Sequence, residues 1–377
     1  MDSHKETILE ILRYLLLGLS VWLYFFTLLA GYSGWINPEK WALPAMLALG
    51  FLPLFVVCVA ATVGWNIYNF RSPIAIIGDV VMALLVFPFF TLCPFGSAKL
   101  KRADEKVFTV MSYNSFYCND TQFENPVRSR TLDYIITTYA DIVCLQELYS
   151  LDAAGTHGKA TETQIRRVKQ MYPYRVEPGS RELVILSRYP LTMLDGDNGK
   201  LFFQYQAVRA NVSGTPVTIL NVHMPSFGLS DEERQIVRKM KSRPSDIKDG
   251  AEEIRHTIYG KLAQAFAARA QAARVIRHFC DTVKGDLIVC GDFNDVPGSY
   301  TYRTVRGEDL RDVYTETAKG YTCTFHAYMM YFHIDQMFYR GDMRALSFRR
   351  GVVKSSDHYP IVGTFALPVA SGAKVAR

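Results

Sequence analysis

The sequence predicts an α/β domain preceded by about three transmembrane helices. Long uncharged apolar segments fill most of the first 97 residues, which predicts the membrane helices. Short apolar segments that alternate with amphipathic helical spacing follow, which predicts the α/β domain. Several of these short segments end in a carboxylate, an amide or an imidazole, so we expect a chemical site where the strands end.

The uncharged segments cover residues 14–38, 41–70 and 80–98. Each is longer than the ~18 residues that suggest a membrane span. We expect helices at about 14–33, 42–64 and 74–96, with a kink at Pro53 and with Asp79 snorkelling to the interface. A cleaved signal peptide fits poorly, because the first segment is long, lacks a small-residue cleavage site and is followed by two more.

The net charge of +6 arises after residue 97, because residues 1–97 carry four Lys or Arg and five Asp or Glu. This mild positive charge suits an anionic substrate or surface without identifying one. The seven cysteines show no CxxC spacing, which argues against a disulfide scaffold and a zinc ribbon and leaves the redox compartment open.

The composition divides the chain into four parts. We expect a transmembrane anchor at 1–97, a basic linker at 98–106, a catalytic domain at 107–367 and a disordered tail at 368–377. A linker of about ten residues reaches ~35 Å when extended, so the domain should stay near the bilayer. We expect four linker cations to contact anionic head groups: Lys99, Lys101, Arg102 and Lys106.

Within the catalytic domain, apolar segments predict strands at 107–114, 141–147, 182–188, 207–212, 217–223 and 286–292, and three more in "HIDQMFY", "RALSFRR" and "IVGTFAL". "GTP" at 214–216 predicts a hairpin turn. Helical spacing marks Leu132–Tyr139 and, over a longer stretch, Ile254–Ile276. Interleaved charges at 230–250 indicate a solvated insertion, and a basic arm for a polyanion is the alternative.

Polar residues stand where the predicted strands end. They are Asn114, Glu147, His223, Asp292, Asn294, Asp357 and His358, with Asp335 inside a strand. An unpaired buried charge costs several kcal/mol, so several such ends together imply convergence on something cationic. Hard oxygen donors without a thiolate select Mg²⁺ or Mn²⁺ over zinc. Such a site suits phosphoester hydrolysis, and the chain has no GxSxG, P-loop or HExxH motif for other hydrolase or NTPase chemistry.

The motif order resembles the endonuclease/exonuclease/phosphatase family. The matching stretches are "SYN", "DIVCLQE", "SRYP", "NVH", "GDFND", "ID" and "SDHYPIV", in that order within residues 107–367. The family includes DNase I-like nucleases, neutral sphingomyelinases and inositol-polyphosphate phosphatases. The resemblance implies a DNase I-like α/β fold, a two-sheet β-sandwich flanked by helices with the site at one end.

The resemblance also implies roles for the polar residues. Glu147 resembles the principal metal ligand, with Asn114 beside it and Asp357 as a second metal-side carboxylate. Asp292 resembles the carboxylate that orients or deprotonates the attacking water. Two residues resemble those that contact the phosphate: the amide of Asn294 and the imidazole of His223. His358 resembles the catalytic imidazole, as base or as electrostatic clamp, and Asp335 its orienting partner.

The N-terminal part resembles the membrane leader of a bacterial subgroup of this family, through "INPEKW" and "NFRSP". Two departures from the family stand out. Gln336 stands where an aromatic residue is usual, and no arginine follows Glu147 closely, which weakens the case for a dedicated DNase. The distribution of Lys and Arg on the two sides of the predicted membrane helices favours a cytoplasmic catalytic domain. The resemblance instead implies an extracytoplasmic domain at the bacterial inner membrane, and we favour this second prediction.

The sequence leaves three functions open. The first is a membrane-anchored, Mg²⁺-dependent phosphoesterase that hydrolyses a phosphodiester or phosphomonoester, such as a lipid head group or another small phosphoester. The second is a membrane-tethered endonuclease or exonuclease acting on nucleic acid. The third is a non-catalytic binding member of the fold, against which the intact polar set counts. The sequence does not identify the oligomeric state.

Overall fold

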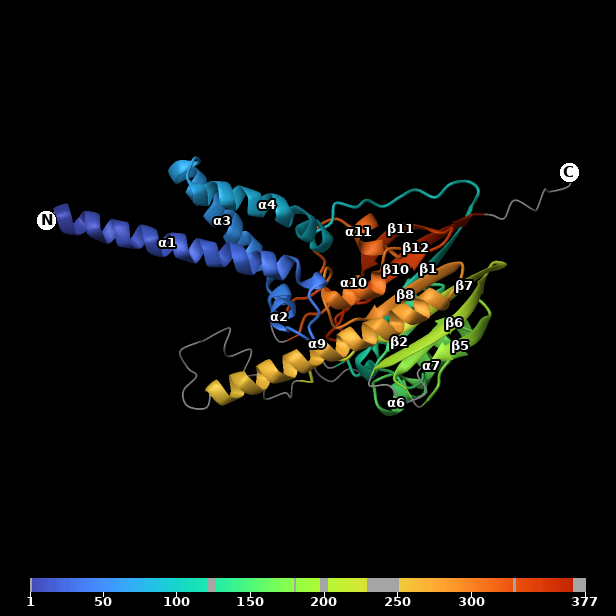
Figure 1. Cartoon of the computed structure of the whole chain (residues 1–377). Helices are drawn as coiled ribbons and strands as arrows, with labels where there is room; N and C mark the ends of the chain where they lie inside the picture. The colour runs from blue at the N-terminus through green and yellow to red at the C-terminus, as the bar shows by residue number, and fades with distance from the viewer. Residues whose placement is uncertain are drawn as a thin grey trace.

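The computed structural model describes residues 2–120, 127–179, 181–196, 203–228, 251–327 and 330–368. Two six-stranded sheets form the centre of the larger part, and a bundle of apolar helices extends from one end (Figure 1). The predicted insertion at 230–250 and nearly all of the predicted tail, residues 369–377, lie outside the described residues.

Each sheet combines strands from distant parts of the sequence. The first sheet has the order β11 (Arg344–Arg350), β12 (Ile361–Pro368), β1 (Glu105–Asn114), β2 (Ile142–Gln146), β4 (Leu183–Ser187), β3 (Tyr174–Val176). The second has the order β5 (Leu191–Gly196), β6 (Gln204–Val212), β7 (Thr215–His223), β8 (Asp286–Asp292), β10 (Asp335–Arg340), β9 (Arg311–Asp312). The predicted hairpin is confirmed, because β6 and β7 pair antiparallel around Ser213 and Gly214, both with positive φ.

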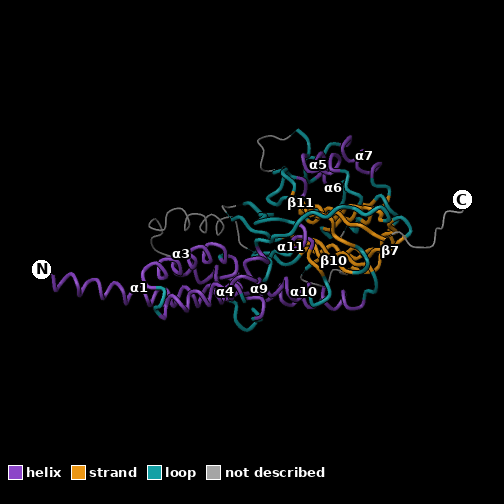
Figure 2. The backbone as a smooth tube through the Cα atoms, turned by 90° about the horizontal axis from the view of Figure 1, so that it is seen from above, coloured by secondary structure: helices purple, strands orange, loops and turns teal. Residues whose placement is uncertain are grey.

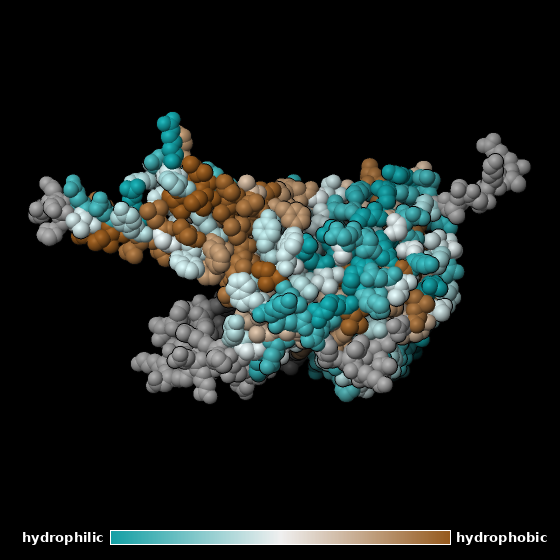
Figure 3. Space-filling view, viewed as in Figure 1, coloured by the Kyte–Doolittle hydropathy of each residue, from teal (hydrophilic) through white to brown (hydrophobic). Residues whose placement is uncertain are grey.

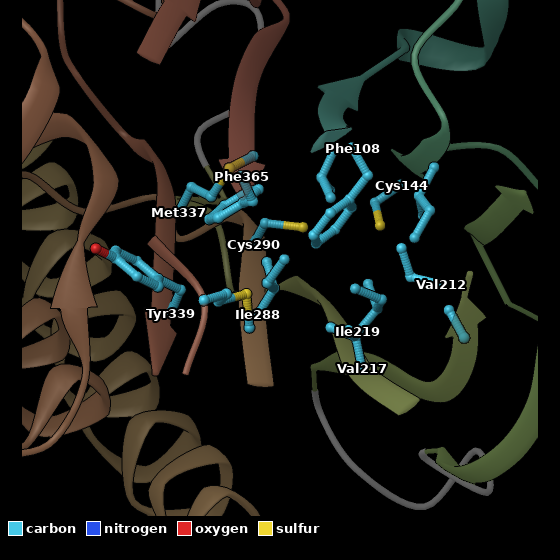
Figure 4. Close-up of a cluster of buried hydrophobic side chains, with 14 of the residues drawn as sticks. Phe108, Cys144, Val212, Val217, Ile219, Ile288, Cys290, Met337, Tyr339 and Phe365 are labelled. Atoms are coloured by element: carbon cyan, nitrogen blue, oxygen red, sulfur yellow. The ribbon is translucent and has the colours of Figure 1, made fainter. Parts of the chain in front are cut away.

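The sheets pack face to face, and helices cover their outer faces (Figure 2). Side chains between the sheets, including Phe108, Ile219, Ile288 and Phe365, form a buried apolar core (Figure 4). The outer face of the first sheet carries α5 (Arg130–Thr138), α6 (Ala153–Thr156) and α7 (Glu162–Met171); the second carries α9 (Ala251–Thr282) and α10 (Tyr300–Arg306), and α11 (Val313–Thr317) packs on β11. This is the predicted two-sheet fold flanked by helices.

Parallel pairing brings the polar strand ends together. β1 pairs parallel with β2, and β7 pairs parallel with β8, so these four strands end at the same end of the sandwich. Gly291 makes the second pairing possible, because its φ is +149° and a Cβ there would lie 1.9 Å from the Val222 carbonyl oxygen. The close approach sets His223 directly beside Asp292 in the register.

The N-terminal helices are α1 (Asp2–Gly31), the 3₁₀ turn Ser33–Trp35, α2 (Leu43–Leu49), α3 (Phe51–Asn69) and α4 (Pro73–Leu92). Three of them, α1, α3 and α4, are long and apolar enough to cross a membrane. Their apolar surfaces contrast with the polar surface over the sheets (Figure 3). We call residues 2–92 the anchor.

The second predicted helix is wrong in one detail. It is not kinked at Pro53 but broken at Gly50, whose φ of −100° and ψ of 11° are not helical. The N–H of Gly50 bonds back to the Leu47 carbonyl and ends α2. Pro53 then lies in the first turn of α3, where its missing N–H removes no helical hydrogen bond.

The anchor packs tightly on the sheet-containing part. Gly34 passes so close that a Cβ there would lie 2.2 Å from the Gly298 carbonyl oxygen. The Tyr314 hydroxyl donates to the Leu92 carbonyl at 2.8 Å. The Glu39 carboxylate accepts from Arg274 at 2.7 Å, and this bond and one from Gln271 hold the pKa of Glu39 down at about 2.

The segment after α4 carries the four cations that we expected to contact head groups. It runs along the sheets, away from the anchor, to the start of β1 (Figure 1). Lys99 pairs with Glu316 at 2.9 Å, and the Lys106 ammonium donates to the Ser213 carbonyl at 3.0 Å. These protein contacts engage two of the cations that we expected to bind head groups.

Candidate active site

The ends of β1, β2 and β8 meet at one amide. The side-chain nitrogen of Asn114 donates to Glu147 Oε1 and to Asp292 Oδ2, both at 3.0 Å. Glu147 follows β2 directly and has a φ of +53°, which turns its side chain out of the strand direction. Burial raises the pKa of Glu147, while His223 and Asn114 oppose the shift. Two carboxylates are thus held together by one amide.

His223 faces the same two carboxylates from the end of β7. Its Nε2 lies 3.8 Å from Glu147 Oε1 and 3.8 Å from Asp292 Oδ2. The His223 side chain keeps 14% of its surface exposed. Among the side chains that form these ion pairs, only that of Glu147 is more exposed, at 21%. His223 is therefore more accessible than His358, whose side chain is 4% exposed.

Asp335 and His358 form a buried pair beside Asp292. His358 Nδ1 lies 2.9 Å from Asp335 Oδ2, and its Nε2 lies 3.5 Å from Asp292 Oδ2. Burial lowers the pKa of His358, but the two carboxylates outweigh it and hold this pKa well above its ordinary value. His358 is thereby kept as an imidazolium whose Nε2 points at Asp292.

The "SSDH" segment is fixed by its serines. The Ser356 hydroxyl donates to the Asn114 carbonyl at 2.8 Å and accepts from the His358 N–H at 3.1 Å. Ser355 lies 2.8 Å from both the Tyr113 and Thr131 hydroxyls. Asp357 stays partly exposed, and its charge acts on Glu147 by raising that residue's pKa. The segment therefore places His358 against Asp292 and keeps Asp357 near Glu147.

Asn294 is fixed through both its backbone and its side chain. Its backbone N–H donates to Asp292 Oδ1 at 2.8 Å, and its side-chain nitrogen donates to the Met224 carbonyl at 3.0 Å. Its φ of +51° closes the turn between these bonds. One amide proton and the amide oxygen remain for a substrate or water.

The comparisons with known proteins identify the family. The sequence profile of the Endonuclease/Exonuclease/phosphatase family matches residues 111–358, from β1 to His358. The chain belongs to this family. Comparison with curated proteins finds no match.

Solved structures of the same fold are distant in sequence. Sphingomyelinase C from Streptomyces griseocarneus is 17% identical, with a TM-score of 0.41, and the match covers 69% of this chain and 99% of that one. The endonuclease/exonuclease/phosphatase from Bacteroides vulgatus is 17% identical, with a TM-score of 0.45, over 69% and 98%. D. rerio TDP2 complexed with a single-strand DNA product is 15% identical, with a TM-score of 0.43, over 69% and 99%.

The family's typical divalent metal fits the residues at the ends of β1 and β2. The Glu147 carboxylate is partly buried, and both burial and the nearby Asp357 raise its pKa. A bound cation would stabilise the charged carboxylate and so oppose both effects. Asp292, Asp335 and His358 also bring three ligand atoms within 4.8 Å of one another. However, Asp335 and His358 are already bonded to each other, which suits a proton-holding pair better than a metal site.

Sequence reasoning missed Arg269, on α9. This guanidinium is fully buried, donates to the Asn294 carbonyl at 2.6 Å and lies over the rings of Phe266 and Phe227. Burial lowers its pKa, although Asp295 at 3.9 Å opposes the shift. In the sequence it is one of several arginines on a helix, and only the fold reveals its burial.

Gln336 stands where the family usually has an aromatic residue, and its side chain forms a hydrogen bond. Its side-chain nitrogen donates to the Asp295 carbonyl at 3.1 Å. Together with Arg269 it fixes the loop that follows β8, which carries Asn294. The departure noted in the sequence therefore concerns support of the loop rather than loss of a catalytic group.

Proposed function

We propose that the chain is a membrane-anchored, Mg²⁺-dependent phosphoesterase. The observation that carries this proposal is the buried Asp335–His358 pair. The His358 Nε2 lies 3.5 Å from Asp292, one of the two carboxylates that accept from Asn114. A charged imidazolium and an adjacent carboxylate suit a reaction in which water attacks phosphorus and negative charge grows on the phosphoryl oxygens.

These residues have two kinds of role, proton transfer and stabilisation of negative charge. Asp292 orients the attacking water and accepts its proton. His358 stays protonated through Asp335, and its Nε2–H donates to a phosphoryl oxygen as the clamp. His223, the more exposed imidazole, and Asn294 hold the phosphate.

Glu147, Asn114 and Asp357 are the residues that we assign to Mg²⁺, with Mn²⁺ as its replacement. When bound, the ion would neutralise charge on the phosphate and on the carboxylates. The Asn114 side-chain nitrogen donates to Glu147, and its side-chain oxygen accepts from the Phe116 N–H at 3.3 Å. The second lone pair of that oxygen could serve as a hard donor.

The placement of the anchor favours a lipid head group as substrate. Ala48 of α2 packs on Val296 and Ile334, which lie beside the active-site residues Asn294 and Asp335 in the sequence. The active-site end of the sandwich therefore lies on the anchor and, with the anchor in a bilayer, near its surface. We place the domain on the extracytoplasmic side of a bacterial inner membrane, as in the subgroup that the leader resembles.

A substrate panel tests this function. The purified full-length chain with Mg²⁺ is offered lipid phosphodiesters, inositol phosphates, plasmid DNA and RNA. We expect turnover of a lipid phosphodiester that is lost in excess EDTA. Rapid cleavage of DNA with a steep salt dependence would replace the lipid assignment by the nuclease. No turnover of any phosphoester would favour the binding member of the fold.

A further inference from the structure

A cavity of about 200 Å³ lies where the anchor meets the catalytic part. Its walls come from the ends of α1 and α4 on one side, and from Gly298 and α10 on the other. At ~30 Å³ for each water, the cavity has room for about six waters, enough for a phosphate group and its neighbouring carbons. The residues of the active site do not line it.

One wall of the cavity is cationic. Arg303 and Arg306 stand three residues apart on α10 and both line the cavity. Within the described part of the chain, no carboxylate lies within 4 Å of either guanidinium. Arg303 lies 3.6 Å from the centroid of the Trp35 ring, and burial lowers its pKa. Glu308 opposes the pKa shift of Arg303, and Arg306 lowers the pKa of Asp312, but neither acid forms an ion pair with these guanidinium groups. Partly desolvated guanidinium groups that lack an ion pair favour an anion, and their paired N–H groups match phosphate geometry.

A second part of the lining is apolar and aromatic. It consists of Phe87, Pro88 and Phe90 from α4 together with Trp35, and Thr91 adds a hydroxyl. Phe87 and Phe90 keep 59% and 42% of their surfaces exposed. They lie near the end of a helix apolar enough to span a membrane. Trp35 lines the same cavity, and tryptophan is enriched at membrane–water interfaces.

We propose that this cavity is a binding site for an anionic phospholipid of the surrounding bilayer. The two guanidinium groups take the head-group phosphate, and the exposed phenylalanines pack along the first part of an acyl chain. Free phosphate would satisfy only the arginines, whereas the adjoining aromatic wall fits a molecule with both a charged head and a hydrocarbon tail. The site is separate from the catalytic residues and stands whether or not the proposed activity does.

Such a lipid would join the anchor to the catalytic part. It would contact α4 and α10 together, and α10 follows the loop that carries Asn294 and Asp295. A bound lipid therefore stabilises the docked arrangement in which the active-site end lies on the anchor.

Lipid binding to the full-length chain in neutral detergent tests the proposal. Native mass spectrometry measures binding of phosphatidylglycerol and phosphatidylcholine, with inorganic phosphate as competitor. We expect phosphatidylglycerol to bind at least about tenfold more tightly, and the Arg303→Gln/Arg306→Gln variant to lose that preference. The matched control is Arg166→Gln/Arg167→Gln, which removes two exposed charges from α7 and should keep it.

The lipid-free melting temperature of each variant shows whether it is folded. If the glutamine variant is not, Arg303→Lys/Arg306→Lys takes its place; it keeps the charges but loses the paired N–H groups, and should reduce the preference by about threefold. Equal binding of the two lipids by the unaltered chain overturns the proposal. Displacement of phosphatidylglycerol by millimolar inorganic phosphate overturns the lipid assignment and leaves a simple phosphate site.

Discussion

Replacing Asp335 by Asn tests how the active site holds its charged imidazole. The Asp335 and His358 side chains are 1% and 4% exposed and lie 2.9 Å apart. Removing one partner of such a buried pair costs about 3–5 kcal/mol. If that loss falls on the transition state, turnover decreases roughly 10²- to 10⁴-fold, since 1.36 kcal/mol changes a rate tenfold.

The same variant should change the pH dependence. Asp335 and Asp292 hold the pKa of His358 above its ordinary value, so the unaltered enzyme keeps its imidazolium as the pH rises. Without the Asp335 charge the proton is lost at lower pH, and the alkaline limb of the kcat/KM profile moves down. The stability that this histidine contributes has the same sign: it is full below the unfolded pKa and disappears as pH rises through the folded pKa.

The assay is the pH profile of kcat/KM on the substrate that the panel identifies, with a melting curve for each variant. Asp312→Asn is the matched control, because Asp312 is also a buried strand-end carboxylate but bonds to the Tyr302 hydroxyl, not to an imidazole. We expect its turnover to stay within about threefold of the unaltered enzyme. An Asp335→Asn enzyme that is folded, with unchanged turnover and an unmoved alkaline limb, would refute the assigned role of the pair.

Three further changes follow from the contacts. Gly34→Ala should lower the melting temperature, because its Cβ would meet a carbonyl oxygen at 2.2 Å. Gly64→Ala is the control and should not lower it, because no atom lies within 4 Å of its Cβ. Equal melting curves for the two variants would contradict the close docking. Arg269→Lys should reduce kcat by about 10- to 100-fold by freeing the Asn294 carbonyl, and an unchanged kcat would exclude this support. Burial raises the pKa of Asp312 to about 6, so the free energy of unfolding should fall by about 2 kcal/mol as pH rises from ~4 to ~6. Asp312→Asn should flatten that slope in denaturant titrations, and the same slope in the variant would assign it to other groups.

The sequence could predict much of the sheet structure because local signals suffice for it. Continuous apolar segments identify buried strands such as β2 and β8, and the Gly-Thr-Pro turn identifies the β6–β7 hairpin. The short strands β3 and β9 escaped prediction because two or three residues carry no periodicity. Strand β5 was not predicted either, because it lies at a sheet edge and its apolar and polar residues alternate only weakly.

The remaining site features depend on tertiary contacts. Polar strand ends indicated which residues meet, but not that Asn114 would join Glu147 to Asp292, or that Asn294 would bond to Met224. Likewise, no local pattern shows that the anchor packs beside the active-site loops. The break at Gly50 separates α3 from α2, whose Ala48 lies against Val296 and Ile334.

The most direct test of the central claim is metal-dependent hydrolysis by the full-length chain. Phosphate-ester turnover is measured with Mg²⁺, in excess EDTA and after Mg²⁺ is restored, for the unaltered enzyme and for Glu147→Gln and His358→Ala. The account predicts activity that EDTA abolishes and Mg²⁺ restores, and a loss of at least about 100-fold in each folded variant. Full activity in EDTA, or in His358→Ala, would contradict it.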